Sequence, residues 1–105
     1  MDGTDTKALQ RLKRKLTIEN LWIYVIAVLV EEGPTYGYDI KKRIATRFGF
    51  KVSPVTLYTV LYRMEREGLL EKEGGYYKPT KIGREAYTRA LEYIAEILAK
   101  LTMPS

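Results

Sequence analysis

The sequence contains no cysteine and no histidine among its 105 residues. Without them the chain cannot form disulfides, thiolate nucleophiles, imidazole bases or zinc sites built from Cys or His. It also has no glycine-rich phosphate loop, no clustered Asp and Glu pattern, and no serine paired with a candidate base. We therefore expect no metal site and no cofactor, and we expect that the protein is not an enzyme.

Long hydrophobic runs are also missing. The longest uninterrupted apolar run is the ten residues 21–30, well short of the roughly 20 that cross a bilayer. No signal peptide with a cleavage site is recognisable, so we expect a soluble, cytoplasmic protein that makes no membrane contact. The absence of Cys and His, together with nine tyrosines and 30% charged residues, also hints at a thermophilic source.

Positive charge is unevenly distributed along the chain. Lys and Arg number 18 against 13 Asp and Glu, which gives a net charge of +5. Residues 1–16 carry five positive and two negative groups, 17–35 carry none and three, and 36–70 carry seven and three. An anionic partner is therefore expected to meet the N-terminal segment and the segment 36–70.

Residues 53–68, SPVTLYTVLYRMEREG, predict an amphipathic helix of about four turns. Ser53 is an N-cap before Pro54 at the first helical position, and Gly68 ends the helix. The apolar positions recur at i, i+3, i+4 and i+7 and are Leu57, Val60, Leu61 and Met64. This pattern predicts one buried face.

The opposite face and its flanks carry groups that donate, accept, stack or pair with phosphate. They are Val55, Thr56, Tyr58, Thr59, Tyr62, Arg63 and Arg66. A helix of this size and chemistry fits a DNA major groove. The alternative is an ordinary surface helix whose polar face is simply hydrated.

Two further helices are expected before it. Residues 7–16 predict a basic amphipathic helix, which either packs on the body of the protein or lies along phosphates. After a start or short break at 17–20, the run 21–30 is apolar on all sides, and the stop signals at 31–34 favour a buried helix over a strand. That helix should form the centre of the core.

A short helix at 36–48, capped by Thr35, should then precede the Ser53 helix across a turn that contains Gly49. Its expected inward stripe is Tyr36, Ile40, Ile44 and Phe48. Two short helices joined by a glycine-containing turn, the second with the polar face, form a helix-turn-helix. This turn is a few residues longer than the tightest form of the motif.

The remaining chain predicts a wing and a last helix. Segments 69–73 and 76–79 are strand-like, and Gly74 and Gly75 suit a tight hairpin turn. Thr80 then caps a helix to about Thr102 with apolar residues at 3-4 spacing over roughly two heptads. We expect this helix to form a dimer contact, with packing on its own domain as the alternative.

Three stretches of the chain resemble the PadR family of transcriptional regulators. They are EEGPTYGYDIKKRI at 31–44, SPVTLYTVLYRMEREGLLE at 53–71 and YYKPTKIGREAY at 76–87. The likeness covers about residues 20–90, and the first two stretches together are fairly specific. It implies a winged helix-turn-helix fold and a dimer formed by the last and the N-terminal helices.

The chain departs from the family pattern in three places. Tyr36 stands where the family usually has His, and Pro79 stands where it usually has Leu. The wing is shorter, and its EGGYY lacks the basic residues often found before the two tyrosines. This puts wing contact with DNA in doubt and leaves Lys72 and Lys78 as its candidates.

We therefore expect a mainly α fold with a small β-wing: a winged helix-turn-helix with N-terminal and C-terminal dimerisation helices. The predicted division is a basic arm at 1–16, a DNA-binding domain at 17–79 and a dimerisation helix at 80–105. The expected function is that of a homodimeric, sequence-specific transcriptional regulator, a repressor, on a pseudo-palindromic operator in double-stranded DNA. The alternatives are an architectural protein that coats DNA without sequence preference and a winged-helix protein-interaction module.

The predicted site residues fall into two groups. Those for DNA are Lys41, Lys42, Lys51, Ser53, Thr56, Tyr58, Thr59, Tyr62, Arg63, Arg66 and Lys78, although Tyr58 and Tyr62 have packing against the wing as an alternative. Those for the dimer are Leu9, Leu12, Trp22, Tyr87, Leu91, Ile94, Leu98 and Leu101. The resemblance also implies that a small-molecule effector can bind near the dimer interface, where Trp22 offers aromatic surface. A core position is the alternative for Trp22.

Overall fold

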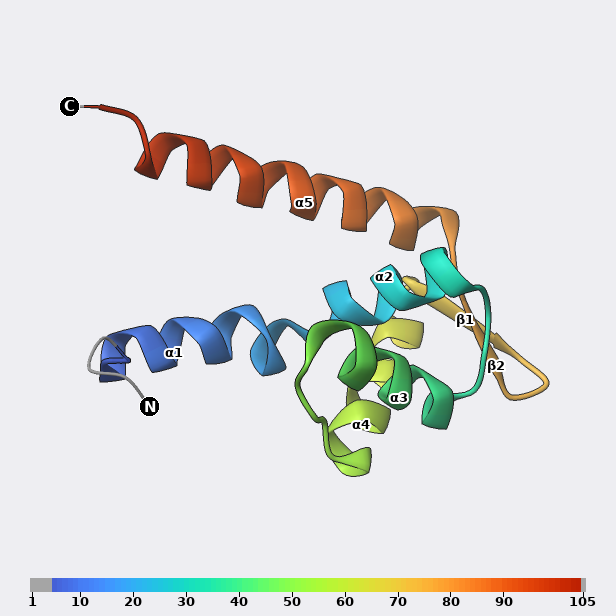
Figure 1. Ribbon diagram of the computed structural model, residues 1–105. Coiled ribbons are helices and arrows are strands. Elements are labelled where there is room, and N and C mark those ends of the chain that lie inside the picture. The colour runs from blue at the N-terminus through green and yellow to red at the C-terminus, as the bar shows by residue number, and fades with distance from the viewer. Residues whose placement is uncertain (1–4, 105) are drawn as a thin grey trace.

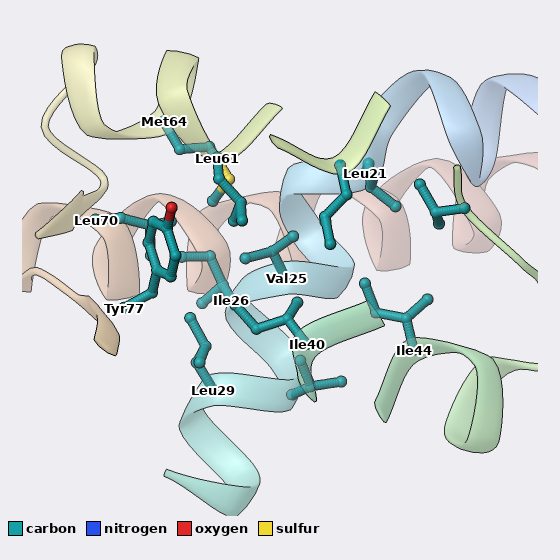
Figure 2. Close-up of a cluster of buried hydrophobic side chains, with 13 residues drawn as sticks. Leu21, Val25, Ile26, Leu29, Ile40, Ile44, Leu61, Met64, Leu70 and Tyr77 are labelled. Atoms are coloured by element: carbon teal, nitrogen blue, oxygen red, sulfur yellow. The ribbon is translucent and has the colours of Figure 1, made fainter. Parts of the chain in front are cut away.

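Helix α2, Leu21–Glu32, lies at the centre of the fold because it is apolar on nearly every side. The computed structural model describes residues 5–104. Val25, Ile26 and Val28 of α2 are completely buried, and Figure 2 shows this helix surrounded by core side chains from the neighbouring elements. The prediction of a helix over a strand at 21–30 is confirmed.

Helix α1, Lys7–Leu16, extends away from this body (Figure 1). It is capped by Thr6 and followed by the short 3₁₀ helix η1, Ile18–Asn20, which is the predicted break. None of its residues is buried, so the expectation that it packs on the body is wrong for the single chain. The physical reason is that α1 extends away from the body, so most of its leucine stripe reaches no apolar surface of residues 5–104. Residues 1–4 of the predicted basic arm at 1–16 lie outside the described residues.

Helices α3, Gly37–Phe48, and α4, Pro54–Arg66, form the helix-turn-helix. Gly49 ends α3 in the left-handed conformation, with φ of 77°. The predicted cap of α3 is wrong by one residue, because Tyr36 is the N-cap and provides no side-chain bond. Thr35 instead donates its hydroxyl to Asp39 Oδ2 at 3.0 Å.

The predicted inward stripe of α3 is correct in its middle and wrong at its start. Ile40 and Ile44 are completely buried, whereas Tyr36 is 50% exposed. Tyr36 lies beside the wing, where its ring stacks on Tyr76 with centroids 4.3 Å apart. Phe48 is half-buried and meets Tyr24 edge to face.

Strands β1, Leu70–Glu73, and β2, Tyr76–Pro79, form the antiparallel wing, with Leu70 opposite Pro79. The turn uses Gly74 and Gly75, both at positive φ, as tight hairpins require. The wing is held to the body because Leu70 and Tyr77 are buried in the core (Figure 2). In addition, the Tyr77 amide donates to the Thr35 carbonyl at 2.8 Å.

Helix α5, Lys81–Leu101, begins at the predicted Thr80 cap, whose hydroxyl accepts from the Gly83 amide at 2.9 Å. Its first half packs on α2 and β2, and every residue from 91 to 100 is exposed. In Figure 1, α5 lies on the opposite side of α2 from α4. The second half of α5 therefore runs past the body, and no side chain in it is buried by the rest of residues 5–104.

These two projecting helices make the molecule elongated. Its radius of gyration is 15.2 Å, against about 13 Å for a compact chain of this length. Its accessible surface is 7594 Å², against about 6,100 Å² for a compact monomer of 12.2 kDa. The single chain thus exposes about 1,500 Å² more than a compact monomer would.

Candidate nucleic-acid interface

The start of α4 is fixed by its own sequence. Ser53 is extended, with φ of −68° and ψ of 149°, and its hydroxyl accepts from the Thr56 amide at 3.2 Å. Pro54 follows at the first helical position, where no amide is needed. The predicted cap is confirmed, and it holds the helix start rigid at the edge of the surface.

The two faces of α4 separate as the spacing predicts. Leu57, Leu61 and Met64 are buried in the core, and Val60 is only partly buried. On the other side, Val55 is 78% and Tyr62 is 61% exposed, and Thr59, Arg63 and Arg66 are exposed as well. This outward face of α4 is therefore not packed against the body of its own chain.

The hydroxyls on this face already make local bonds. Ser53 Oγ lies 2.9 Å from Thr56 Oγ1, and Thr59 donates to the Val55 carbonyl at 2.8 Å. Each hydroxyl oxygen keeps an unused lone pair, so it can still accept from a ligand. Ser53 serves first as the helix cap, Thr59 is exposed on the outward face, and Thr56 is half-buried on its flank, beside Trp22.

Most cations around α4 have no acidic partner. The side chains of Lys41, Lys51 and Arg63 make no hydrogen bond or ion pair with any residue in the described range 5–104. Lys42 lies over the Tyr38 ring at 5.7 Å, and Arg66 lies over the Tyr62 ring at the same distance. These five side chains leave a positive surface around the exposed face of α4, the condition for binding phosphates.

Two arginines of α3 have a different role, which the sequence did not reveal. The Arg43 side chain is 14% exposed, bonds to the Gly33 carbonyl at 2.7 Å and pairs with Asp39 at 3.0 Å. Arg47 pairs with Glu31. Both therefore neutralise the end of α2, whose terminal carbonyls and glutamates carry negative charge.

Tyr58 links the two helices of the motif. A Cβ atom on Gly37 would lie 2.7 Å from the end of the Tyr58 ring, so a larger residue there would force this ring to move. The ring therefore lies against the start of α3. The ring is still 47% exposed, so its outer edge remains available to a ligand.

The wing offers little free positive charge. Lys78 lies 3.6 Å from Glu71, directly across the hairpin, and Lys72 lies over the buried Tyr77 ring at 5.3 Å. Both candidates for a basic wing contact with DNA, Lys72 and Lys78, therefore already interact within the wing. What the wing does expose beside α3 is Tyr76, 44% exposed, stacked on Tyr36. The sequence analysis missed this pair because no local pattern joins positions 40 residues apart.

The predicted dimer residues lie on the other side of α2. Leu12, Leu91, Ile94, Leu98 and Leu101 are 52%, 43%, 44%, 61% and 78% exposed. Leu9, Trp22 and Tyr87 are half-buried. A largely apolar groove of about 500 Å³ lies between α2, α5 and the end of α1, and Trp22, Tyr87, Leu91 and Ile94 all line it. Leu9, Leu12, Leu98 and Leu101 lie outside that groove.

Trp22 also lines a second groove, of about 450 Å³, beside α4. Its walls there include Val55, Thr56, Thr59 and Arg63. The predicted core position is thus only partly correct, because the half-buried indole separates the apolar groove from the outward face of α4. Within residues 5–104, no group of three or more acidic side chains could hold a metal ion, and no helix has both the length and the apolar character to cross a membrane.

Comparisons with known proteins agree with this geometry. A relative, the transcriptional regulator Rv3488 of Mycobacterium tuberculosis, is 43% identical over 61 residues, which are 48% of this chain and 57% of the relative. A solved transcriptional regulator from Clostridium thermocellum superimposes with a TM-score of 0.69 at 24% identity, over 79% of this chain and 93% of that one. The winged-helix DNA-binding protein F93 from STIV gives 0.64 at 18% identity, over 77% and 92%. At these identities the two structures support the fold alone.

A family model described as "Transcriptional regulator PadR-like family" matches residues 25–89, which include most of α2, the helix-turn-helix, the wing and the start of α5. Because the members of this family are regulators, the expectation that the chain is not an enzyme is confirmed. The chain belongs to the PadR-like family of transcriptional regulators and has their winged-helix DNA-binding fold.

Proposed function

We propose that the protein is a homodimeric repressor that recognises a pseudo-palindromic operator by inserting α4 of each subunit into a major groove. The observation that carries this proposal is the outward face of α4, which is exposed, polar and bordered by five cations without acidic partners. Base contacts would come from Thr56, Thr59, Tyr62 and Arg63. Lys41, Lys42, Lys51 and Arg66 would neutralise backbone phosphates.

Support for the homodimer comes from the surface that the single chain leaves exposed. The excess of about 1,500 Å² per chain is within the range that stable dimers bury on each subunit. The apolar positions of α1 and α5 and the groove beside Trp22 are the surface that a second copy would cover. Two-fold symmetry would then set the half-sites about one helical turn, roughly 34 Å, or a multiple of it apart.

The dimer is tested with a charge placed in the middle of the exposed apolar stripe of α5. Ile94→Asp should convert the dimer to a folded monomer, because burying an unpaired carboxylate in an apolar contact is costly. Thr88→Asp, on the charged outer side of the same helix, is the matched control and should remain dimeric. Sedimentation velocity distinguishes the states, and a wild-type monomer at all concentrations would refute the homodimer.

Sequence specificity is tested by selecting bound fragments from genomic DNA with the purified protein. A regulator should favour the selected site over bulk DNA by about 10³ or more at physiological salt. An architectural protein would show little preference and a steep loss of affinity with salt. If the protein binds no DNA even at low salt, it is an interaction module and the DNA-binding proposal fails.

The direction of regulation needs a transcription assay. We expect added protein to lower transcription in vitro from a template whose promoter overlaps the selected site, because the bound dimer occupies the polymerase's DNA. A template with a scrambled site is the control. Increased transcription from the intact template would make the protein an activator.

A further inference from the structure

The first turn of α4 exposes an apolar side chain on an otherwise polar face. Val55 is the second residue of the helix. At 78% exposed, it equals Leu101 as the most exposed large apolar side chain within residues 5–104, so it contributes little to the core. Helix-turn-helix proteins contact base edges through the N-terminal residues of the second helix. Val55 therefore stands where a base edge would be met.

Val55 begins a row of three side chains along α4. Thr59 and Arg63 follow it at intervals of four residues, which places the three along one side of the helix with a rise of about 6 Å from each to the next. All three line the groove of about 450 Å³ beside Trp22. The row thus presents a valine, a threonine and an arginine in that order.

The hydroxyl protons near the start of this row are used within the protein. Ser53 donates to Thr56 Oγ1 at 2.9 Å, and Thr59 donates to the Val55 carbonyl at 2.8 Å. The exposed Thr59 side chain therefore offers a methyl group and oxygen lone pairs, but no proton. Val55 and Thr59 together present methyl groups, and the donor in this row is the guanidinium of Arg63.

These groups match some bases better than others. In the major groove, guanine is read by paired donors of Arg or Lys, and adenine is read by the amide of Asn or Gln. Thymine carries a C5-methyl group that apolar side chains contact. Helix α4, PVTLYTVLYRMER, contains no Asn, Gln or Lys. The thymine methyl is therefore the feature of an A·T pair that the start of this row fits.

Resting on the DNA-binding function proposed above, we propose that Val55 and the methyl group of Thr59 determine specificity for thymine by contacting its C5-methyl group in the major groove. Arg63, next in the row, supplies the donors that guanine accepts. Each methyl contact removes apolar surface of both partners from water, which contributes about fourfold in affinity. Each operator half-site should therefore contain thymines that are recognised by their methyl groups.

The test replaces each thymine of the selected operator in turn by deoxyuridine, which lacks only the C5-methyl group and keeps the same hydrogen-bonding atoms. Where a contacted thymine is replaced, the wild-type protein should bind about fourfold more weakly, as measured by fluorescence anisotropy.

Two variants assign the contacts to side chains. Val55→Ala shortens the apolar side chain, and Thr59→Ser removes the methyl group but keeps the hydroxyl. Each should bind the unmodified operator about fourfold more weakly and should no longer respond to deoxyuridine at the thymine it contacts. Val30→Ala, which shortens a valine that is 51% exposed on α2, is the matched control and should respond as wild type does.

Other outcomes overturn the proposal in distinguishable ways. If no deoxyuridine weakens binding of the wild-type protein, thymine methyl groups are not recognised. If Val55→Ala and Thr59→Ser bind more weakly but keep the full wild-type response to deoxyuridine, these side chains affect the helix and not a base, and the proposal fails. Wild-type protein that binds no DNA at low salt refutes the DNA-binding function itself, a separate result that is seen before any base is replaced.

Discussion

Two glycines lie in close contact with groups from another of the three stretches that resemble the PadR family. Because neither glycine has a side chain, the stretches can pack together at these points. Gly37 accepts the Tyr58 ring, which joins the first stretch to the second. Gly83 lies so close to the Leu69 carbonyl that a Cβ would be 2.1 Å from the oxygen, which joins the third stretch to the second. The Thr80 hydroxyl strengthens this second junction by donating to the Gly68 carbonyl at 2.6 Å.

The close approach of Gly83 to the Leu69 carbonyl gives a prediction about stability. Gly83→Ala should destabilise the protein by about 2–3 kcal/mol, lowering the melting temperature by about 10 °C or more, because the new methyl group meets backbone that cannot swing away. Thr88→Ala, on an exposed part of the same helix, is the control and should melt within a few degrees of wild type. Circular dichroism melting measures both. A Gly83→Ala variant as stable as wild type would mean that α5 can shift to admit a side chain.

Arg63 gives the corresponding prediction about binding. Arg63→Ala should weaken binding to the selected operator by about 5- to 150-fold, since an exposed guanidinium without a partner in residues 5–104 is free to contact bases or phosphates. Its melting temperature should not change. Arg89→Ala, exposed on α5 on the far side of α2, controls for the loss of one charge. Equal affinity of the Arg63→Ala and wild-type proteins, measured by fluorescence anisotropy, would remove Arg63 from the interface.

For single residues, the predictions from the sequence were correct where they depended only on neighbours in the same helix. The Ser53 cap and the outward position of Arg63 follow from residues within one helix, and both agree with the structure. The predictions failed where a distant element competes for the side chain. Thr35 looked like a cap but bonds to Asp39, and Tyr36 looked like core but is stacked on the wing. No spacing rule within α3 contains that information.

At the scale of elements, hydrophobic spacing together with cap and turn residues predicted each α-helix and both strands that the structure has within residues 5–104. It could not say what covers an apolar face, because amphipathicity describes one side of an interface only. The sequence therefore left open whether the stripe of α1 packs on the body, and the single chain leaves it without a buried residue. For α5, the first half packs on α2, which is the alternative that the sequence left open, and the second half is exposed. The dimer contact expected of this helix stays a prediction.

The exposed stripe of α1 gives a prediction that separates folding from assembly. Leu12→Asn should leave the melting behaviour of the monomer unchanged, because Leu12 is already 52% exposed in the single chain. It should raise the dimer dissociation constant by about tenfold or more if a partner covers the stripe, since a buried leucine contributes about 1.5–3 kcal/mol. Arg11→Asn, the neighbouring residue on the cationic side, is the control. If both variants dimerise as wild type does, α1 is not part of the interface.

At the scale of the whole molecule, α2 separates two surfaces with different chemistry. One side carries α4 with its exposed Tyr58 and Tyr62 and the cations without acidic partners, and the other carries the uncovered apolar parts of α5 (Figure 1). A partner that covers the apolar side leaves the cationic side open, so dimerisation and DNA binding need not compete. The same arrangement explains why a 105-residue chain exposes more surface than a compact monomer.

Trp22 stands between these two sides and is the only tryptophan, so its emission should report on both events. Raising the protein concentration through the dimer dissociation constant should shift the emission to shorter wavelength, because a partner in the apolar groove removes water from the indole. Adding operator to the dimer should change the emission again, since the second groove includes Thr56 and Arg63 of α4. Ile94→Asp should keep the monomer spectrum at all concentrations. If the emission stays constant while sedimentation records dimer formation, Trp22 lies outside the interface and the partner covers a different part of α5.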